Sequence, residues 1–140
     1  MIKLSEFDRI GGRRGITGLA EKCYMKVLKN GKNASKPSLY LKLSKRLTTE
    51  FTEKYGMGYK CRVFASPDFR QVVVARGDDK TVSVAKKTSG AGLIQCGAVV
   101  EDFLLTVGTD VDKYFYDGKW DTDENGNRVI LLTHNGQVEK

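Results

Sequence analysis

The sequence predicts an α+β fold: a small, mostly-β domain with short helices, in which two tandem βαββ units form a barrel-like core. Its 140 residues are enough for one domain with a sizeable core. Strict apolar alternation, typical of half-buried strands, flanks short stretches with helical spacing. We expect a basic, glycine-containing arm and a first element in residues 1–36, a basic unit in 37–80, and an acidic unit with a long terminal hairpin in 81–140.

The N-terminal stretch FDRIGGRRGITG contains four glycines around Arg13 and Arg14. Glycine clusters are typical of loops, so we expect an arm that carries these two arginines. Residues 19–29 fit two structures, because one set of apolar positions has helical spacing and an overlapping set alternates as in a strand. The two sets are Leu19, Cys23 and Val27 for the helix, and Cys23, Met25 and Val27 for the strand.

From Ser38 to Ala65 the pattern predicts a strand, a helix and a further strand. The first strand has leucine at every second position: Leu39, Leu41 and Leu43. Ser44 is suited to cap the helix, because its hydroxyl can accept a backbone N–H, and Gly56 is suited to end it. The helical face between them is apolar at Leu47, Phe51 and Tyr55. Alternation returns from Tyr59 to Ala65, and SPDF turns the chain into the strand RQVVVAR.

The same order of elements returns later in the chain. Sliding the sequence by 52 positions places Leu41 on Leu93, Phe51 on Phe103 and Gly56 on Gly108. Only the first copy is basic: Lys42, Lys45, Arg46, Lys54, Lys60 and Arg62 align with Ile94, Gly97, Ala98, Thr106, Asp112 and Tyr114. Either the repeat is real and the fold does not need these charges, or the similarity arose by chance.

The charge is distributed unevenly along the chain. The formal net charge is +7, with sixteen Lys and Arg against six Asp and Glu in residues 1–70, and eight against eleven in residues 71–140. A basic half of this kind indicates a surface for a polyanion such as nucleic acid. The alternative is an ordinary solvated surface that keeps a small protein soluble.

This tandem order, the glycine after the short helix and the apolar spacing extend over residues 38–134. In these features the chain resembles the SpoVT/AbrB-like swapped-hairpin DNA-binding proteins, in the two-repeat arrangement of the MraZ type. The resemblance implies an intertwined β-barrel, oligomerisation and binding of double-stranded DNA, as in a transcriptional regulator.

The residues themselves predict a basic strand face. Tyr40 and Lys42 share one face of their strand, as do Lys60, Arg62 and Phe64 of theirs, so the two faces merge if the strands are neighbours. The cations would neutralise phosphates, and the rings of Tyr40 and Phe64 would stack on unpaired bases. We add further cations from the start of the helix and from the arm: Lys45, Arg46, Arg13 and Arg14.

Other chemistry finds little support in the sequence. His134 is the only histidine and pairs with no nucleophile by spacing, so we expect no enzyme. Three widely spaced cysteines indicate neither a disulfide framework nor a zinc site, and no apolar run suits a membrane, so we expect a cytoplasmic protein without metal or cofactor. The stretch DTDENG matches half of a calcium loop, but a hairpin with an Asn-Gly turn explains it better.

A second function remains open, that of a protein-binding accessory factor. A small basic and acidic protein of this kind is expected of phages and mobile elements, where it inhibits a host or defence complex. Either its acidic stretch from Asp110 to Glu124 would occupy a nucleic-acid channel of the target, or its basic patch would bind the nucleic acid of the target.

Overall fold

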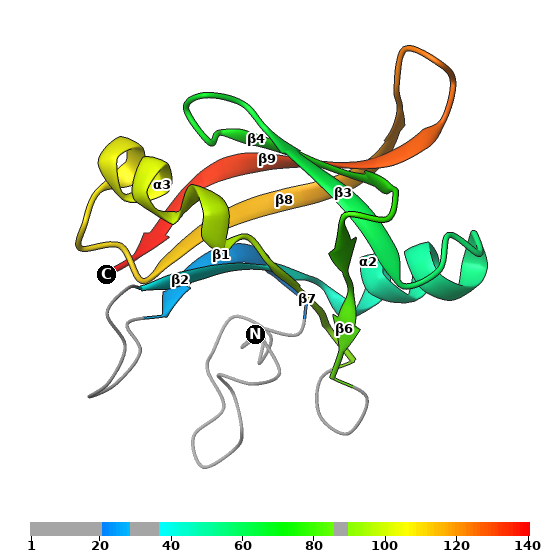
Figure 1. Ribbon diagram of the computed structural model, residues 1–140, viewed down its shortest axis with the longest axis horizontal. Helices are drawn as coiled ribbons and strands as arrows, with labels where there is room; N and C mark the ends of the chain where they lie inside the picture. Colours follow the sequence, from blue (N-terminus) through cyan, green and yellow to red (C-terminus); the bar gives the residue numbers. More distant parts are fainter. Residues whose placement is uncertain (1–20, 29–36, 86–89) are drawn as a thin grey trace, which may run out of the picture.

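The computed structural model describes residues 21–28, 37–85 and 90–140, so the predictions for Arg13 and Arg14 lie outside the described residues. The described part is mostly β, with short helices (Figure 1). Its elements follow one another in this order: β1 (Cys23–Leu28), β2 (Ser38–Leu43), α2 (Lys45–Thr49), the π-helical turn η2 (Glu50–Lys54), β3 (Lys60–Ala65), β4 (Gln71–Arg76), β5 (Lys80–Thr81), β6 (Ser83–Val84), β7 (Gly92–Gln95), the 3-10 turn η3 (Gly97–Val99), α3 (Val100–Val107), β8 (Lys113–Thr122) and β9 (Arg128–Glu139).

The strands form one antiparallel sheet of nine strands in the order β5-β3-β4-β9-β8-β1-β2-β7-β6. The sheet curls strongly, and its two edge strands, β5 and β6, are consecutive in the chain and joined by Val82 (Figure 1). No ladder pairs β5 with β6, so the sheet is open and the expected barrel-like core is not confirmed.

The ambiguous segment before residue 29 is a strand. Cys23, Met25 and Val27 are each under 5% exposed, as the alternation requires. β1 lies between β8 and β2, and Met25 is paired with Tyr114 on one side and Leu41 on the other. A helix at this position would leave β8 and β2 each with one unpaired edge.

The first predicted helix forms, but with a change of pitch. Ser44 is its N-cap and accepts the N–H of Leu47, as expected. After Thr49 the turn widens to a π-helix, in which the N–H of Tyr55 donates to the C=O of Glu50 (2.8 Å). Gly56 follows with φ of 60°, the left-handed conformation that glycine adopts at a helix end.

Strand, helix, strand, strand occurs twice among the described elements, as β2-α2-β3-β4 and as β7-α3-β8-β9. Within the helices the 52-residue offset holds, because Phe51 and Phe103 are both fully buried. Between the first strands of the two units, β2 and β7, the correct offset is 53 residues instead of 52. The buried set Leu39, Leu41 and Leu43 corresponds to Gly92, Ile94 and Cys96, so Leu41 is equivalent to Ile94, and Leu93 faces the other side.

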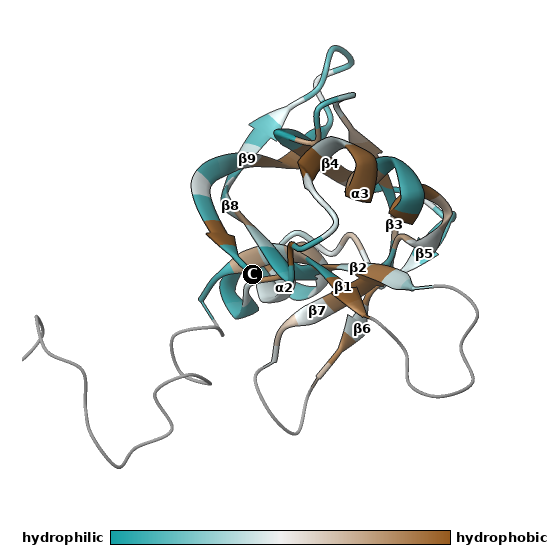
Figure 2. Ribbon diagram, turned by 90° about the vertical axis from the view of Figure 1, so that its left-hand side faces the viewer, coloured by the Kyte–Doolittle hydropathy of each residue, from teal (hydrophilic) through white to brown (hydrophobic). Residues whose placement is uncertain are grey.

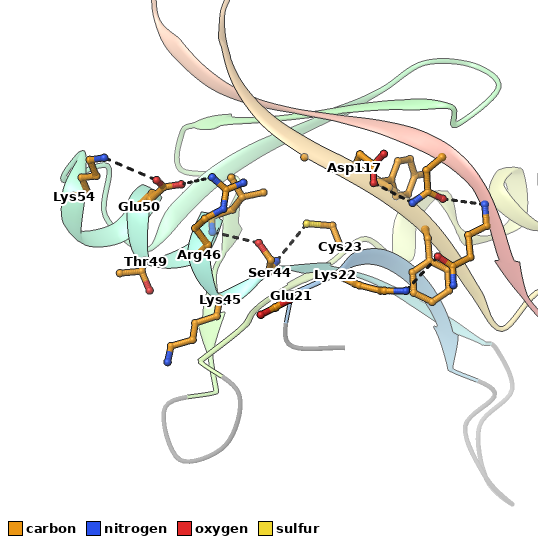
Figure 3. A pocket seen from close by; sticks show the side chains of 16 residues that line it. Glu21, Lys22, Cys23, Ser44, Lys45, Arg46, Thr49, Glu50, Lys54 and Asp117 are labelled. Carbon is orange, nitrogen blue, oxygen red and sulfur yellow. Dashed lines mark hydrogen bonds and ion pairs between the residues drawn. The ribbon is translucent and has the colours of Figure 1, made fainter. Parts of the chain in front are cut away.

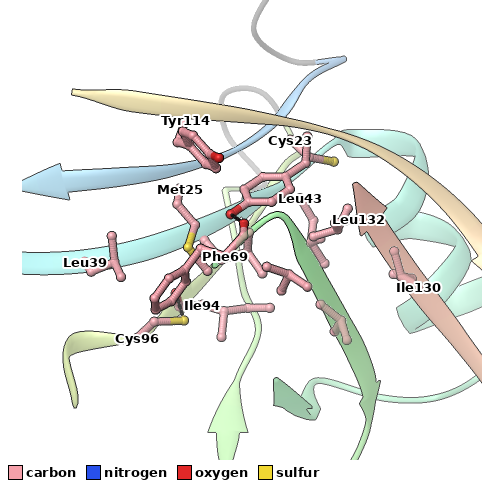
Figure 4. Close-up of a cluster of buried hydrophobic side chains, with 14 of the residues drawn as sticks. Cys23, Met25, Leu39, Leu43, Phe69, Ile94, Cys96, Tyr114, Ile130 and Leu132 are labelled. Atoms are coloured by element: carbon pink, nitrogen blue, oxygen red, sulfur yellow. Dashed lines mark hydrogen bonds between the residues drawn. The ribbon is translucent and has the colours of Figure 1, made fainter. Parts of the chain in front are cut away.

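The two units share one sheet and one core. β2 pairs with β7 and β4 pairs with β9, so strands of the two units are neighbours at two places in the sheet. Buried side chains from both units meet in a single cluster, which includes Leu39 and Leu43 of the first and Ile94 and Leu132 of the second (Figure 4). The two units on either side of residue 80 therefore do not have independent cores.

The expected terminal hairpin forms from β8 and β9, and its tip is hydrophilic (Figure 2). Asp123 accepts the N–H groups of Asn125 and Asn127 (2.9 Å each), and Gly126 has a φ of 79°. These bonds use the Asp123 carboxylate within the turn itself and lower its pKa, the Asn127 backbone bond first. No group of three potential metal-ligating side chains occurs among the described residues.

The acidic stretch from Asp110 to Glu124 does not form one patch. Ten-residue strand β8 separates its two ends, which lie about 30 Å apart along the extended chain. Asp110 and Asp112 at one end form ion pairs with Lys140 and Lys26. The acidic stretch is therefore spread along a strand, and its use against a nucleic-acid channel stays a prediction.

Candidate functional site

The predicted merged basic face is wrong, because β2 and β3 are not neighbours. β2 lies between β1 and β7, whereas β3 lies between β4 and β5. Tyr40 and Lys42 therefore belong to a different part of the sheet from Lys60, Arg62 and Phe64. Local alternation was correct in each strand, but the pairing of the strands depends on residues distant in sequence.

Lys42 is also buried and cannot serve as a surface contact for phosphate. It is 6% exposed, and its Nζ lies 5.0 Å from the centre of the Tyr24 ring. Burial lowers the pKa of Lys42, and burial likewise raises the pKa of Tyr40, which is half-buried. Lys42 thus covers the outer face of β1, where the aromatic ring partly compensates its lost hydration.

Lys60, Arg62 and Phe64 do lie on the exposed face of β3. Phe64 is 56% exposed. The Arg62 guanidinium lies 3.5 Å from carboxylate oxygens of both Asp78 and Asp79. These carboxylates offset the positive charge of Arg62, so this face is less basic than the sequence alone suggested.

The excess positive charge of the chain lies outside the described residues. Of the 24 Lys and Arg, nine lie in residues 1–20, 29–36 and 86–89, together with two of the 17 Asp and Glu. The described residues therefore contain fifteen cationic and fifteen anionic side chains, and their formal charge is zero. The entire excess of +7 belongs to the three other segments, so we looked for a polyanion site where these segments join the described chain.

A large cleft lies at one such junction (Figure 3). It has a volume of about 1150 Å³, and we call it the first cleft. α2 and η2 form one wall, the start of β1 forms another, and β8 with the end of β9 forms the third. Its lining includes four cations, three carboxylates and one cysteine: Lys22, Lys45, Arg46, Lys54, Glu21, Glu50, Asp117 and Cys23. The predicted residues Lys45 and Arg46 thus line a cleft.

Close packing against β8 positions the helical wall. A Cβ on Gly118 would lie 2.5 Å from Leu47 Cδ1, so the glycine lets the helix approach the strand. Trp120 of β8 stacks on Phe51, and its Nε1 donates to Glu50 (3.0 Å). These contacts fix the helix beside β8 and direct its polar residues to the cleft margin.

Glu50 organises the cations of this wall. Its carboxylate lies 3.6 Å from Arg46 and 4.0 Å from Lys54, and its side chain is only 18% exposed (Figure 3). The Arg46 and Lys54 side chains are 67% and 61% exposed. Long, exposed ion pairs of this kind contribute little stability, so both cations can turn toward an external anion at small cost.

Two of the three basic segments join the described chain at the first cleft. Glu21, where residues 1–20 end, lines it. Residues 86–89, which include Lys86 and Lys87, connect Ala85 to Gly90, and a Cβ on Gly90 would lie 3.1 Å from Lys45 Cγ. Residues 29–36 instead join Leu28 to the opposite end of β2.

The short chain between Arg14 and Glu21 limits how far the arm arginines can lie from the cleft. Arg14 is seven residues before Glu21 in the sequence, so an extended chain between them spans at most about 25 Å. The arm residues Arg13 and Arg14 lie outside the described residues, and this length of chain is enough for them to reach the cleft. The sequence analysis did not include Lys22, Lys54, Lys86 and Lys87 among the candidate residues. Each of these lysines lies close in sequence to the end of a strand or helix, and that position was the signal that could have identified them.

A second cleft occupies the equivalent place in the other copy. It has a volume of about 570 Å³ and lies between β3 and α3. With the 52-residue offset of the helices, Arg46, Leu47, Glu50 and Lys54 of the first cleft correspond to Ala98, Val99, Asp102 and Thr106 of the second. With the 53-residue offset of the strands, Tyr116 and Gly118 correspond to Val63 and Ala65.

No protein-family model, curated protein or solved structure matches the chain. Within the described ranges, no helix has the length and apolar character needed to cross a membrane. The resemblance to swapped-hairpin DNA-binding proteins accordingly stays a prediction, and the geometry of the two clefts carries the functional argument.

Proposed function

We propose that the protein binds nucleic acid, without catalysis, through contacts of the first cleft and of the adjoining basic segments 1–20 and 86–89 with the phosphate backbone. The observation that carries this proposal is the convergence of charge. The described residues carry no net charge, and two of the three other segments, with +4 of the excess of +7, join the described chain beside a cleft that already has Lys22, Lys45, Arg46 and Lys54.

The chemistry of the cleft favours backbone contact over base recognition. The four cations of its lining lie on two of its walls, Lys22 beside the start of β1 and the other three on α2 and η2, which suits a row of phosphates between them. Phe115 and Tyr116, the aromatic residues of its lining, are 2% and 3% exposed, so they offer no free ring for base stacking. Affinity should therefore depend strongly on salt and weakly on sequence.

Three carboxylates of the lining limit this attraction, and two of them have other partners. Glu50 accepts from Trp120 and faces Arg46 and Lys54, and Asp117 accepts from Asn135 Nδ2 (3.1 Å). Repulsion from these groups keeps the cleft alone weak, so the arm arginines and the two lysines of residues 86–89 have to supply much of the affinity.

The experiment compares four double charge reversals by binding of a labelled 20-base-pair DNA duplex over a range of salt concentrations. Three alter the proposed surface: Arg13→Glu with Arg14→Glu, Lys45→Glu with Arg46→Glu, and Lys86→Glu with Lys87→Glu. The fourth, Lys60→Glu with Arg62→Glu, changes the net charge equally on the outer face of β3. It tests the face that the sequence predicted.

We expect each of the first three variants to lose at least tenfold in affinity and to flatten the salt dependence by about two phosphate contacts. The β3 variant should lose less than threefold. Equal losses in all four would indicate attraction by net charge alone, and absence of binding by the wild type at 50 mM salt would refute the proposed function. Replacing the duplex by single-stranded DNA and by RNA then identifies the preferred polyanion.

A further inference from the structure

The second cleft has the same position as the first but a different chemistry. Its walls are β3, the turn after β3, η3 and α3. Most of its lining is apolar: Met25, Val63, Ala65, Pro67, Phe69, Ala98, Val99 and Leu105. At its margin Leu105 is 82% exposed, and it aligns with Glu53 of the first copy. A leucine so exposed contributes nothing to the core that the helix already buries through Phe103.

β3 presents an unpaired edge to this cleft. β5 pairs with β3 only at Lys60 and Cys61. Tyr59 C=O accepts from Val82 on the β5 side, whereas Ser66 N–H donates to Gln71 C=O on the β4 side. Since antiparallel residues alternate between the two sides, Val63 and Ala65 direct their N–H and C=O groups away from β4 and toward the cleft. No described residue pairs with them there.

Two charged side chains also line the second cleft. Lys80 lies on the β5 side and Asp102 on α3. Neither forms a hydrogen bond or an ion pair with another described residue. A ligand that complements the cleft therefore has an extended backbone, apolar side chains, one carboxylate and one cation.

We propose that the second cleft binds an extended segment of a partner protein, which adds to the edge of β3 through main-chain hydrogen bonds with Val63 and Ala65. Its apolar side chains pack against Phe69, Val99 and Leu105. Its carboxylate lies opposite Lys80, and its cation lies opposite Asp102. The free edge from Arg62 to Ala65 accommodates about four residues, or about 13 Å of strand.

The geometry favours a peptide segment over a second copy of the chain. In a second copy, α3 would flank the same edge of β3, so insertion of that strand would bring the helix along with it. A segment with both edges free meets no such obstacle. The site is separate from the first cleft and does not depend on the proposed binding of nucleic acid.

The experiment uses the full chain labelled with nitrogen-15 and a synthetic probe, acetyl-Lys-Val-Thr-Val-Thr-Val-Glu-amide, together with the peptide in which Lys and Glu are exchanged. Titration followed by amide shifts should move Val63, Ala65 and Leu105 with one of the two peptides. N-methylation of the peptide at alternate residues should weaken binding at least tenfold, because it removes the donors needed for strand addition.

Three variants test the assigned contacts. Ala65→Pro removes the N–H that faces the cleft and leaves the ladder with β4 intact, and Leu105→Asp places a charge at the apolar margin. Each should weaken binding at least tenfold, whereas Val138→Asp, at a residue 39% exposed elsewhere, should change it less than twofold. Lys80→Glu with Asp102→Lys should reverse the preference between the two peptides.

Several results would overturn the proposal. These are absence of amide shifts at β3 up to millimolar peptide, a concentration-dependent dimer that Leu105→Asp dissociates, or tenfold tighter peptide binding after deletion of residues 1–20. The second result would assign the cleft to another copy, and the third to the chain's own N-terminal segment. Lys45→Glu with Arg46→Glu should leave peptide binding unchanged, which separates this proposal from the proposed function.

Discussion

The first and second clefts are equivalent in architecture and opposite in chemistry. Each lies between a helix of one copy and a strand of the other, since α2 faces β8 and α3 faces β3. Both helices bury a phenylalanine completely, at Phe51 and Phe103. Only the first has cations where the second has Ala98 and Thr106. The comparison teaches that the fold requires the buried residues of each copy and leaves the cleft-lining residues free to differ.

The largest expected effect concerns what the two copies share. Phe51→Ala and Phe103→Ala should each lower the free energy of unfolding by about 3–5 kcal/mol, because each removes a fully buried ring and leaves a cavity. Urea unfolding followed by circular dichroism measures this. Leu105→Ala is the control, with a change of about 0.5 kcal/mol or less at an exposed site. If either phenylalanine proves dispensable, the two helices are not equivalent parts of the core.

The next effect concerns what the copies do not share. Arg46→Ala with Lys54→Thr gives the first helix the side chains of the second at these positions. We expect the slope of log affinity against log salt to fall by about 1.8, the value for two lost phosphate contacts. Arg70→Ala with Arg76→Thr removes the same charge at the two ends of β4, where Arg70 directly precedes the strand, and should alter the slope by much less. Equal slopes for the two variants would remove the distinction between the clefts.

A smaller difference lies at the starts of the helices. Ser44 caps α2 through the N–H of Leu47, whereas Cys96 and Val99 make no side-chain cap for η3 and α3. Ser44→Ala should therefore cost about 1 kcal/mol of unfolding free energy. Chemical denaturation should show no comparable loss for Ser83→Ala at an exposed strand position. A Ser44→Ala variant as stable as the wild type would mean that neither copy depends on its cap.

The smallest expected effect is electrostatic and belongs to the second copy. Asp112, just before β8, forms an ion pair with Lys26 at 2.9 Å. The hydrogen bond from Lys26 lowers the pKa of Asp112, so its stabilising contribution exists above the ordinary pKa of about 3.9 and disappears as pH falls through the lower, folded-state value.

Asp112→Asn should therefore cost about 0.5 kcal/mol at pH 7, a value reduced by solvent screening of a side chain that is 37% exposed. The cost should vanish in unfolding measurements near pH 2. Glu124→Gln on the exposed hairpin tip provides the control. A cost that persists at pH 2 would show that packing, and not charge, supports this position.

Local patterns predicted most of the elements. Alternation of buried residues located β2, β3 and β4, and the combination of Ser44, helical spacing and Gly56 located the first helix with its cap. The choice between helix and strand for Cys23–Leu28 could not be made locally. It depends on β8, more than eighty residues away, which provides the ladder partner.

The site was predicted less completely, for a physical reason. Alternation shows which side chains share a face of one strand, but only strand order shows which faces merge, and β2 and β3 proved to be separate. Lys42 is buried, and its ammonium group lies over the ring of Tyr24 on the neighbouring strand. This contact depends on strand pairing, so the alternation within β2 could not reveal it. Lys45 and Arg46 are exposed and line the first cleft, because the first turn of a helix that follows a strand stays accessible; their role in binding stays a prediction.

The pairing of strands from different units also has a consequence for how the chain reaches its native state. Neither half can complete its part of the sheet before the other has been synthesised, because β1 must wait for β8 and β4 for β9. Such distant pairings give a high contact order and slow folding, in milliseconds to seconds. During translation the first unit leaves the ribosome with exposed strand edges, so newly made chains should need chaperones more than the small size of the protein suggests.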